Sequence, residues 1–133
     1  MLALCTGNSC RSQLLHGYLA EALGKWAAVY SAGWKYTAST RAVRVMAEDG
    51  VDISGHASNH VDEYASVPFD CVVTVCDHAN EVCPVFPSLA QKRHHNFPDP
   101  ARATGSEEET MAQFRAVRNQ VKAYAQDFVR EAF

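Results

Sequence analysis

The sequence predicts an α/β protein: a single domain over residues 1–133 that forms a doubly wound, parallel, four-stranded sheet with helices on both faces. Short apolar runs alternate along the chain with segments whose apolar residues recur at helical spacing. Residues 69–75 hold a β-branched run without polar alternation, which is typical of a strand covered on both faces. A chain of 133 residues is also long enough to bury a core as one domain.

The first half of the chain predicts strand, polar loop, helix, strand and helix in that order. Residues 1–4 form a short apolar run, residues 5–12 are polar, and apolar residues recur at helical spacing over residues 14–23. Residues 27–32 form a second apolar run. A second helix is indicated over residues 42–50, which end in an Asp-Gly stop signal. This alternation is typical of parallel sheets.

The second half continues the pattern with two strands and a closing helix. The third strand covers residues 69–75, and a short fourth strand is expected around residues 94–97, just before the Pro-Asp-Pro segment at 98–100. An apolar stripe over residues 111–128 predicts the closing helix, with acidic residues 107–109 at its positive N-terminal end.

Three chemically useful residues follow expected strands: Cys5, Cys76 and Asp99. In doubly wound sheets, ligands bind beyond the carboxyl ends of the strands, so these residues are candidates for a site. Five cysteines are an odd number at uneven spacing, which argues against a secreted disulfide framework and for redox or metal chemistry in a reducing compartment.

The bulk composition favours a cytoplasmic protein. Lys and Arg number 12 against 15 Asp and Glu, a net charge of −3 that gives no indication of a nucleic-acid partner. No apolar run approaches the ~18 residues of a membrane span, and the apolar start is too short for the core of a signal peptide. We therefore expect no membrane partner.

The segment from Cys5 to Arg11 has the properties of an oxyanion-binding loop. It lies between an expected strand and an expected helix, where backbone N–H groups can surround a tetrahedral anion at the positive helix end. The same field, the Arg11 guanidinium and the Ser12 hydroxyl would make Cys5 a nucleophile. Arg11 can bind two anion oxygens at once. The loop residues expected to contact substrate are Thr6, Gly7, Asn8, Ser9, Cys10 and Arg11.

Other readings of this loop are possible from the residues alone. Cys5 could be a small buried hydrophobe at the end of a strand, and the loop a well-capped helix start. The loop lacks Gly-Lys-Ser or Gly-Lys-Thr, so it is not a nucleotide-binding Walker loop.

Residues 4–13, Leu-Cys-Thr-Gly-Asn-Ser-Cys-Arg-Ser-Gln, resemble the signature of the low-molecular-weight protein tyrosine phosphatase and arsenate reductase superfamily. Further segments resemble the thioredoxin-coupled arsenate reductases in the same order and at similar spacing: residues 29–33, 72–76, 83–84 and 97–101. The resemblance covers nearly the whole chain. It implies a low-molecular-weight phosphatase-like fold, arsenate as substrate, thioredoxin as reductant and no bound cofactor. We expect the protein to act as a monomer.

Two further cysteines favour a reductase over the alternative, a low-molecular-weight tyrosine phosphatase, which would not use Cys76 and Cys83. Arsenate reduction takes two electrons. A second thiol must therefore displace arsenic from the first and form a disulfide with it, and a third thiol must attack that disulfide to free the first thiol. The resemblance implies that Cys5 attacks arsenate and Cys76 then attacks Cys5. Cys83 finally attacks Cys76, and the Cys76–Cys83 disulfide passes to thioredoxin. Asp99 resembles the general acid of the superfamily, and its place before Pro100 favours a loop.

Several of these residues have a structural alternative. Cys71 lies within an expected strand and reads as core, and Cys10 reads as a residue that shapes the loop. Asp99 could be a turn residue between prolines. A zinc site is conceivable from Cys76, His78, Cys83, His94 and His95, but their spacing does not match the usual ligand gaps, and we expect no metal. A non-catalytic binding domain would have no reason to keep a nucleophile, an anion clamp and a relay pair together.

The sequence departs from the family pattern at a cation site. Some thioredoxin-coupled members hold potassium beside the loop with an asparagine, matched here by Asn8, and two carboxylates. This chain has His16 and Asn59 at the two carboxylate positions. Because an imidazole and an amide attract a hard cation poorly, we expect no specific potassium binding. We expect His16 to hydrogen-bond Asn8 instead.

Overall fold

The computed structural model describes residues 1–5, 10–24, 27–33, 40–56, 59–64, 66, 69–76, 91–100 and 103–132. Its strands are β1 (Leu2–Leu4), β2 (Tyr30–Ala32), β3 (Cys71–Thr74) and β4 (Gln91–His94). Its helices are α1 (Arg11–Leu23), α2 (Thr40–Glu48), the 3-10 helix η1 (Val61–Tyr64) and α4 (Glu107–Ala132). None of the helices described is long and apolar enough to cross a membrane.

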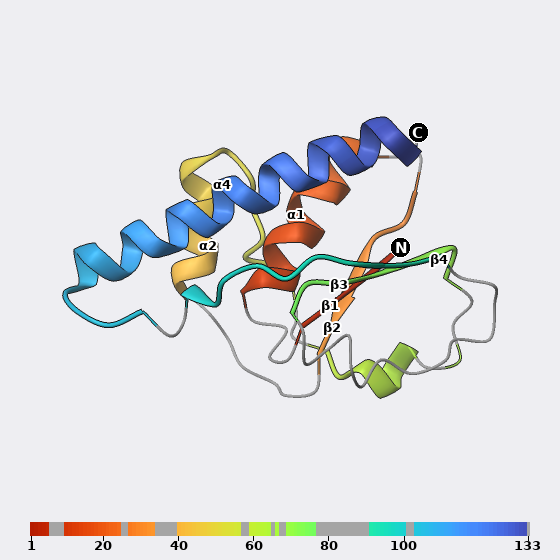
Figure 1. Ribbon diagram of the computed structural model, residues 1–133, viewed down its shortest axis with the longest axis horizontal. Coiled ribbons are helices and arrows are strands. Elements are labelled where there is room, and N and C mark those ends of the chain that lie inside the picture. The colour runs from red at the N-terminus through yellow and green to blue at the C-terminus, as the bar shows by residue number, and fades with distance from the viewer. Residues whose placement is uncertain are drawn as a thin grey trace.

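The described strands form one parallel sheet in the order β2-β1-β3-β4, as Figure 1 shows. Leu4 at the end of β1 pairs with Ala32 of β2 on one side and with Thr74 of β3 on the other. The predicted fold class, a parallel four-stranded α/β sheet, is therefore confirmed. Strand β2 lies on one side of β1, and β3 and β4 lie on the other, so the strand order changes direction at β1. In such sheets, ligands bind at the carboxyl end of the strands at this switch point.

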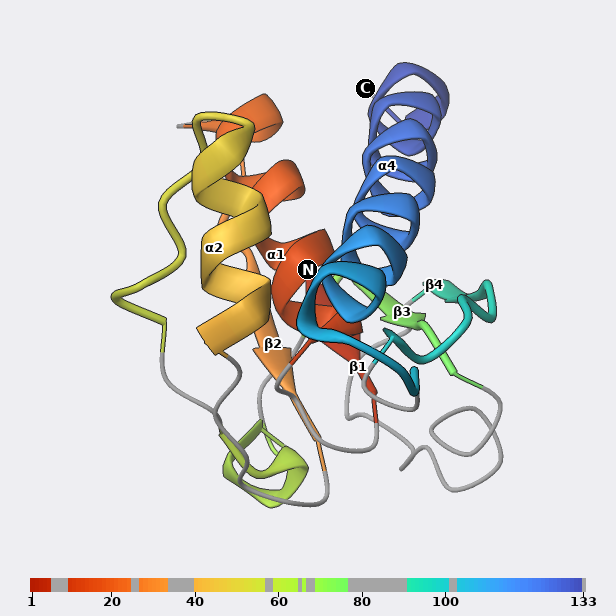
Figure 2. The ribbon, with the colours of Figure 1, turned by 90° about the vertical axis from the view of Figure 1, so that its left-hand side faces the viewer.

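Helices α1, α2 and α4 pack together over one face of the sheet, while η1 lies on the other side (Figures 1 and 2). Val72 and Val73 are consecutive residues of β3, so their side chains point to opposite faces, yet both are buried. The two-sided burial predicted for this strand is thus confirmed. Burying each such aliphatic side chain stabilises the fold by roughly 1.5–3 kcal/mol.

Local signals fix the ends of the helices. The backbone N–H of Glu109 donates to Oγ of Ser106 at 3.1 Å, an N-cap that satisfies one of the free amides at the start of α4. Helix α2 ends at Glu48, and Gly50 follows with φ 78, a conformation that favours glycine. The predicted stop of this helix is therefore confirmed.

The fourth strand lies earlier in the chain than expected. It covers Gln91–His94 rather than residues 94–97. It is the edge strand of the described sheet and carries mostly exposed polar side chains, so an apolar pattern could not locate it. Phe97, the apolar residue that misled the prediction, is buried beyond the end of the strand.

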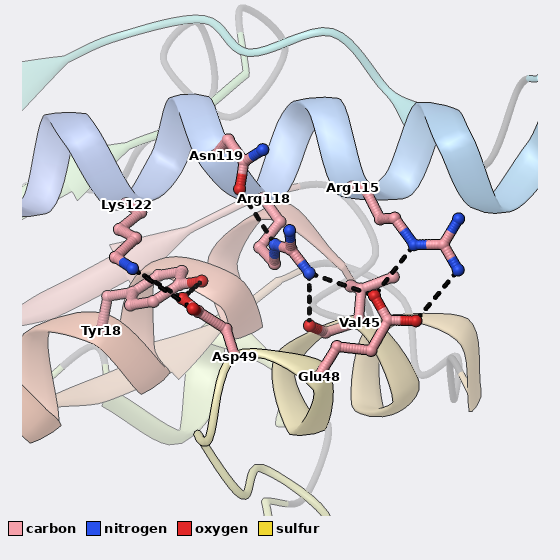
Figure 3. A network of polar contacts seen from close by, with 8 residues as sticks. All are labelled: Tyr18, Val45, Glu48, Asp49, Arg115, Arg118, Asn119 and Lys122. Carbon is pink, nitrogen blue, oxygen red and sulfur yellow. Dashed lines mark hydrogen bonds and ion pairs between the residues drawn. The ribbon is translucent and has the colours of Figure 1, made fainter.

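Ion pairs fasten the long helix α4 to α2 (Figure 3). Arg115 binds Glu48 through Nε and Nη2 at 2.9 and 3.0 Å. Arg118 donates through Nη1 to the Val45 carbonyl at 2.9 Å, so it satisfies an acceptor in the last turn of α2. Bidentate geometry and a carbonyl cap make these contacts stronger than an ordinary surface ion pair.

A second polar contact ties α4 to both α1 and α2 (Figure 3). The Tyr18 hydroxyl of α1 donates to Asp49 at 2.7 Å, and Lys122 of α4 lies 3.0 Å from the same carboxylate. Asp49 follows α2 directly, so one carboxylate joins three helices. The helical layer is held as one unit above the sheet.

Candidate active site

The candidate nucleophile follows the central strand β1. The Cys5 amide donates to the Ala32 carbonyl at 3.2 Å, and the Val75 amide donates to the Leu4 carbonyl at 2.9 Å. The backbone on both sides of Cys5 is therefore held by the neighbouring strands. Cys5 forms no disulfide with another described cysteine, and the residue is 3% exposed.

Ser12 lies beside the Cys5 thiol. Its Oγ is 3.0 Å from Cys5 Sγ, and the serine is fully buried in the first turn of α1. A hydroxyl in this position can donate to a thiolate, and the helix N-terminus adds a positive field. The arrangement stabilises negative charge on sulfur.

Arg11, the first residue of α1, lies across this edge near Asp99. Its Nη1 donates to the Phe97 carbonyl at 3.0 Å, and its Nη2 is 3.7 Å from Oδ2 of Asp99. The arginine side chain is 13% exposed and that of Asp99 is 27% exposed. The fold thus brings a cation and a carboxylate together at the same edge as Cys5 and Ser12.

Cys76 follows β3, the strand that pairs with β1. Because Leu4 is opposite Thr74, Cys5 and Cys76 leave neighbouring strands at the same edge of the sheet. Cys76 is buried and forms no disulfide with another described cysteine. Cys83 lies outside the described residues, as do Thr6, Gly7, Asn8 and Ser9 of the predicted loop.

Cys10 and Cys71 are free thiols in different surroundings. Cys10 is buried at the start of α1, and burial raises its pKa far above the ordinary value, with the negative charges of Cys5 and Asp99 adding to the effect. Cys71 is buried in β3, where burial also raises its pKa. Both thiols stay protonated near neutral pH, which fits structural roles.

A half-buried pair of histidines lies beside Gln13 and Ser31, where the sequence pointed only to His16. His16 Nδ1 is 2.9 Å from Ser31 Oγ, and its ring stacks on His56 with centroids 4.0 Å apart. His56 Nδ1 is 3.0 Å from Oε1 of Gln13, the residue after Ser12. Burial, followed by the charge of His56, lowers the pKa of His16 to about 4, so both hydrogen bonds involve a neutral ring.

The expected contact between His16 and Asn8 falls outside the described residues. Asn59, the second position of the cation site, donates from its side-chain nitrogen to the Tyr64 hydroxyl at 3.1 Å. Within the described part of the chain, no three His, Cys, Asp or Glu side chains are grouped so that they could hold a metal ion.

A buried cysteine at the end of the central strand, with a serine hydroxyl beside it and an arginine on the first turn of the following helix, is the arrangement of an α/β enzyme with a thiol nucleophile. The chain belongs to the low molecular weight phosphotyrosine protein phosphatase family, whose model matches residues 1–132.

Relatives within this family are called arsenate reductases. The chain is 45% identical over 119 residues to the arsenate reductase of Halalkalibacterium halodurans, which covers 89% of this chain and 86% of that protein. It is 42% identical over 126 residues to the arsenate reductase of Bacillus subtilis, with 94% and 91% covered.

Solved structures agree on the fold. An arsenate reductase in its oxidized state matches with a TM-score of 0.84 at 24% identity, over 98% of this chain and 95% of the other. An arsenate reductase in a phosphate-binding state matches with a TM-score of 0.77 at 26% identity, over 98% and 95%.

Proposed function

We propose that this protein reduces arsenate to arsenite through Cys5, Cys76 and Cys83, and that thioredoxin regenerates it. The observation that supports the proposal most is the placement of two buried cysteines, Cys5 and Cys76, after paired strands of one sheet, with no disulfide among the described cysteines. Relatives at 42–45% identity that are called arsenate reductases support the choice of substrate. A relay of free thiols works in a reducing compartment, so we place the protein in the cytoplasm.

In the first step, Arg11 and the N-terminus of α1 hold the oxyanion. The Cys5 thiolate forms a sulfur–arsenic bond and one arsenate oxygen leaves. Asp99, which lies 3.7 Å from Arg11, supplies the proton that lets this oxygen depart as water. Ser12 supports Cys5 while the thiolate is charged.

In the second step, the Cys76 thiolate attacks Cys5 Sγ. The electron pair of the sulfur–arsenic bond stays on arsenic, which leaves as arsenite, and a Cys5–Cys76 disulfide forms. Cys83 then attacks Cys76, which frees Cys5 as a thiolate and leaves a Cys76–Cys83 disulfide. Thioredoxin returns the two electrons to this disulfide by thiol exchange.

The alternative function is hydrolysis of phosphate monoesters, which the family as a whole favours. Cys5, Ser12, Arg11 and Asp99 would suffice for transfer of a phosphoryl group to sulfur and then to water. Cys76 would have no part in that reaction.

One assay separates the two functions. Arsenate is supplied with thioredoxin, thioredoxin reductase and NADPH, and arsenite formation is measured beside NADPH consumption; an aryl phosphate is tested in parallel. We expect one arsenite per NADPH and slow ester hydrolysis. Rapid ester hydrolysis without arsenite would replace the proposal with the phosphatase alternative.

A further inference from the structure

The Arg11 guanidinium contacts the backbone carbonyl of Phe97 as well as the Asp99 side chain. Nη1 donates to the Phe97 carbonyl at 3.0 Å, and the arginine side chain is only 13% exposed. A guanidinium must present its donors in a fixed plane to bind two oxygens of an anion. The position of the Phe97 carbonyl therefore affects the orientation of the anion clamp.

Phe97 itself lies beyond the end of β4, where the regular strand pairing has ended. Its amide donates to the Val75 carbonyl at 3.1 Å, which holds the nitrogen side of the residue. The carbonyl side leads into the Pro98-Asp99-Pro100 segment. The orientation of this carbonyl depends on how firmly the Phe97 side chain is packed.

The packing comes from a cluster of three rings, His95, Phe97 and Tyr124. Phe97 is 1% exposed, and its ring meets Tyr124 edge to face, with centroids 5.6 Å apart and an interplanar angle of 83°. The His95 ring contacts both rings, and its centroid lies 4.5 Å from that of Phe97 and 4.9 Å from that of Tyr124. Edge-to-face geometry fixes ring direction as well as distance.

Tyr124 belongs to α4, which makes it a firm support. Lys122 and Arg118, within two turns of Tyr124, bind Asp49 and Val45 in the network of Figure 3. Asp49 also accepts a hydrogen bond from Tyr18 of α1, the helix whose first residue is Arg11. These contacts restrict the movement of Tyr124 relative to Arg11.

We propose that Tyr124 is a positioning residue for Arg11, which it orients through the ring and carbonyl of Phe97. The proposal rests on the role of Arg11 as anion clamp in the proposed function. Tyr124 does not touch the substrate; it keeps the arginine in the plane that binds an oxyanion. Its loss should weaken oxyanion binding and raise KM more than it lowers kcat.

The test measures the Kd of inorganic phosphate for the reduced protein by 31P NMR titration, beside KM and kcat for an aryl phosphate. Tyr124→Met removes the ring at similar volume, with Tyr124→Leu as a second variant. We expect Kd to rise about fivefold, because the Phe97 ring loses its edge-to-face partner. Tyr124→Phe should bind phosphate like wild type.

Two controls show whether the effect passes through Arg11. Phe114 is 2% exposed on the same helix, and no ring contact joins it to Phe97 in the described part of the chain, so Phe114→Leu should leave Kd unchanged within twofold. Lysine lacks the planar donors with which Arg11 can bind an anion and a carbonyl together. In the Arg11→Lys variant, adding Tyr124→Met should therefore weaken phosphate binding no further.

The outcomes distinguish this inference from the proposed function. Wild-type phosphate binding by folded Tyr124→Met and Tyr124→Leu, beside weak binding by Arg11→Lys, would overturn the role of Tyr124 and leave the clamp in place. An equal loss in both backgrounds would also overturn it. Wild-type binding by Arg11→Lys would overturn the clamp role in the proposed function, and this inference with it.

Discussion

The Sγ of Cys5 lies 3.0 Å from the Oγ of Ser12, and both side chains are buried at the junction of β1 and α1. A buried thiolate without a donor would be costly, because charge is poorly solvated in the protein interior. The Ser12 hydroxyl can supply such a donor, and a thiolate, which has no proton to give, can only accept in this contact. From this geometry we infer that the Ser12 hydroxyl stabilises the thiolate form of Cys5.

Ser12→Ala should therefore slow the reactions of Cys5. A hydrogen bond to a charged group contributes roughly 1.5–3 kcal/mol, so alkylation of Cys5 by iodoacetamide at pH 7 should slow about tenfold or more. Mass spectrometry of the Cys5 peptide measures the rate. Thr110→Ala removes another buried hydroxyl, on α4, and should leave the rate unchanged. Equal rates for Ser12→Ala and wild type would contradict the role given to Ser12.

The proposed relay assigns different steps to the cysteines. Cys5→Ser should abolish arsenate reduction and ester hydrolysis together, because both need the same nucleophile. Cys76→Ser and Cys83→Ser should lose multiple-turnover arsenate reduction and still hydrolyse an aryl phosphate slowly. Cys71→Ser, which removes a thiol buried elsewhere in β3, is the matched control and should retain both activities. Full arsenate turnover by Cys83→Ser with thioredoxin alone would refute the relay.

The stacked pair of His16 and His56 should make the fold sensitive to acid. Burial lowers the pKa of His16 to about 4, and burial also lowers the pKa of His56. A histidine in the unfolded chain titrates near 6.5, so between pH 6.5 and 4 the unfolded state binds more protons than the folded state. The stabilisation is complete above about pH 6.5 and falls as the pH drops toward 4, by at most on the order of 3 kcal/mol for His16.

Urea unfolding at pH 7, 5.5 and 4.5 measures this loss. His16→Gln does not titrate, so its free energy of unfolding should fall less between these pH values than that of wild type. Gln91→Asn, at an exposed position of β4, should follow the wild-type curve. If His16→Gln and wild type lose stability in parallel, other groups cause the acid sensitivity.

The parts of the site that could be predicted are those that local sequence determines. An apolar run before a polar loop and a helical stripe located Cys5 and Arg11, and the β-branched run of β3 located Cys76. His56 and Gln13 could not be paired, because 43 residues separate them and no local pattern links the two. Tyr124 read only as one residue of an apolar stripe. Its contact with Phe97 joins α4 to the segment that follows β4, and sequence spacing does not encode which helix residue faces that segment.

The last prediction concerns the cation site that the family resemblance implies for some relatives. His16 Nδ1 is 2.9 Å from Ser31 Oγ, and its ring is stacked on His56 and hydrogen-bonded to the Val29 backbone. The side-chain nitrogen of Asn59 is directed to the Tyr64 hydroxyl. By the family resemblance, a neutral imidazole and an amide stand where some relatives have two carboxylates, and potassium prefers oxygen ligands with negative charge.

We therefore expect kcat/KM for arsenate to be the same in sodium chloride and potassium chloride at equal ionic strength. Chloride is used as the anion because sulfate could compete for the oxyanion loop. The variant His16→Glu restores one carboxylate next to Ser31 and should create a preference for potassium, provided that the buried charge is compensated by the bound cation. Gln91→Glu adds the same charge at an exposed position of β4 and should create none. A several-fold activation of the wild type by potassium alone would contradict this prediction and show that other oxygens rebuild the site.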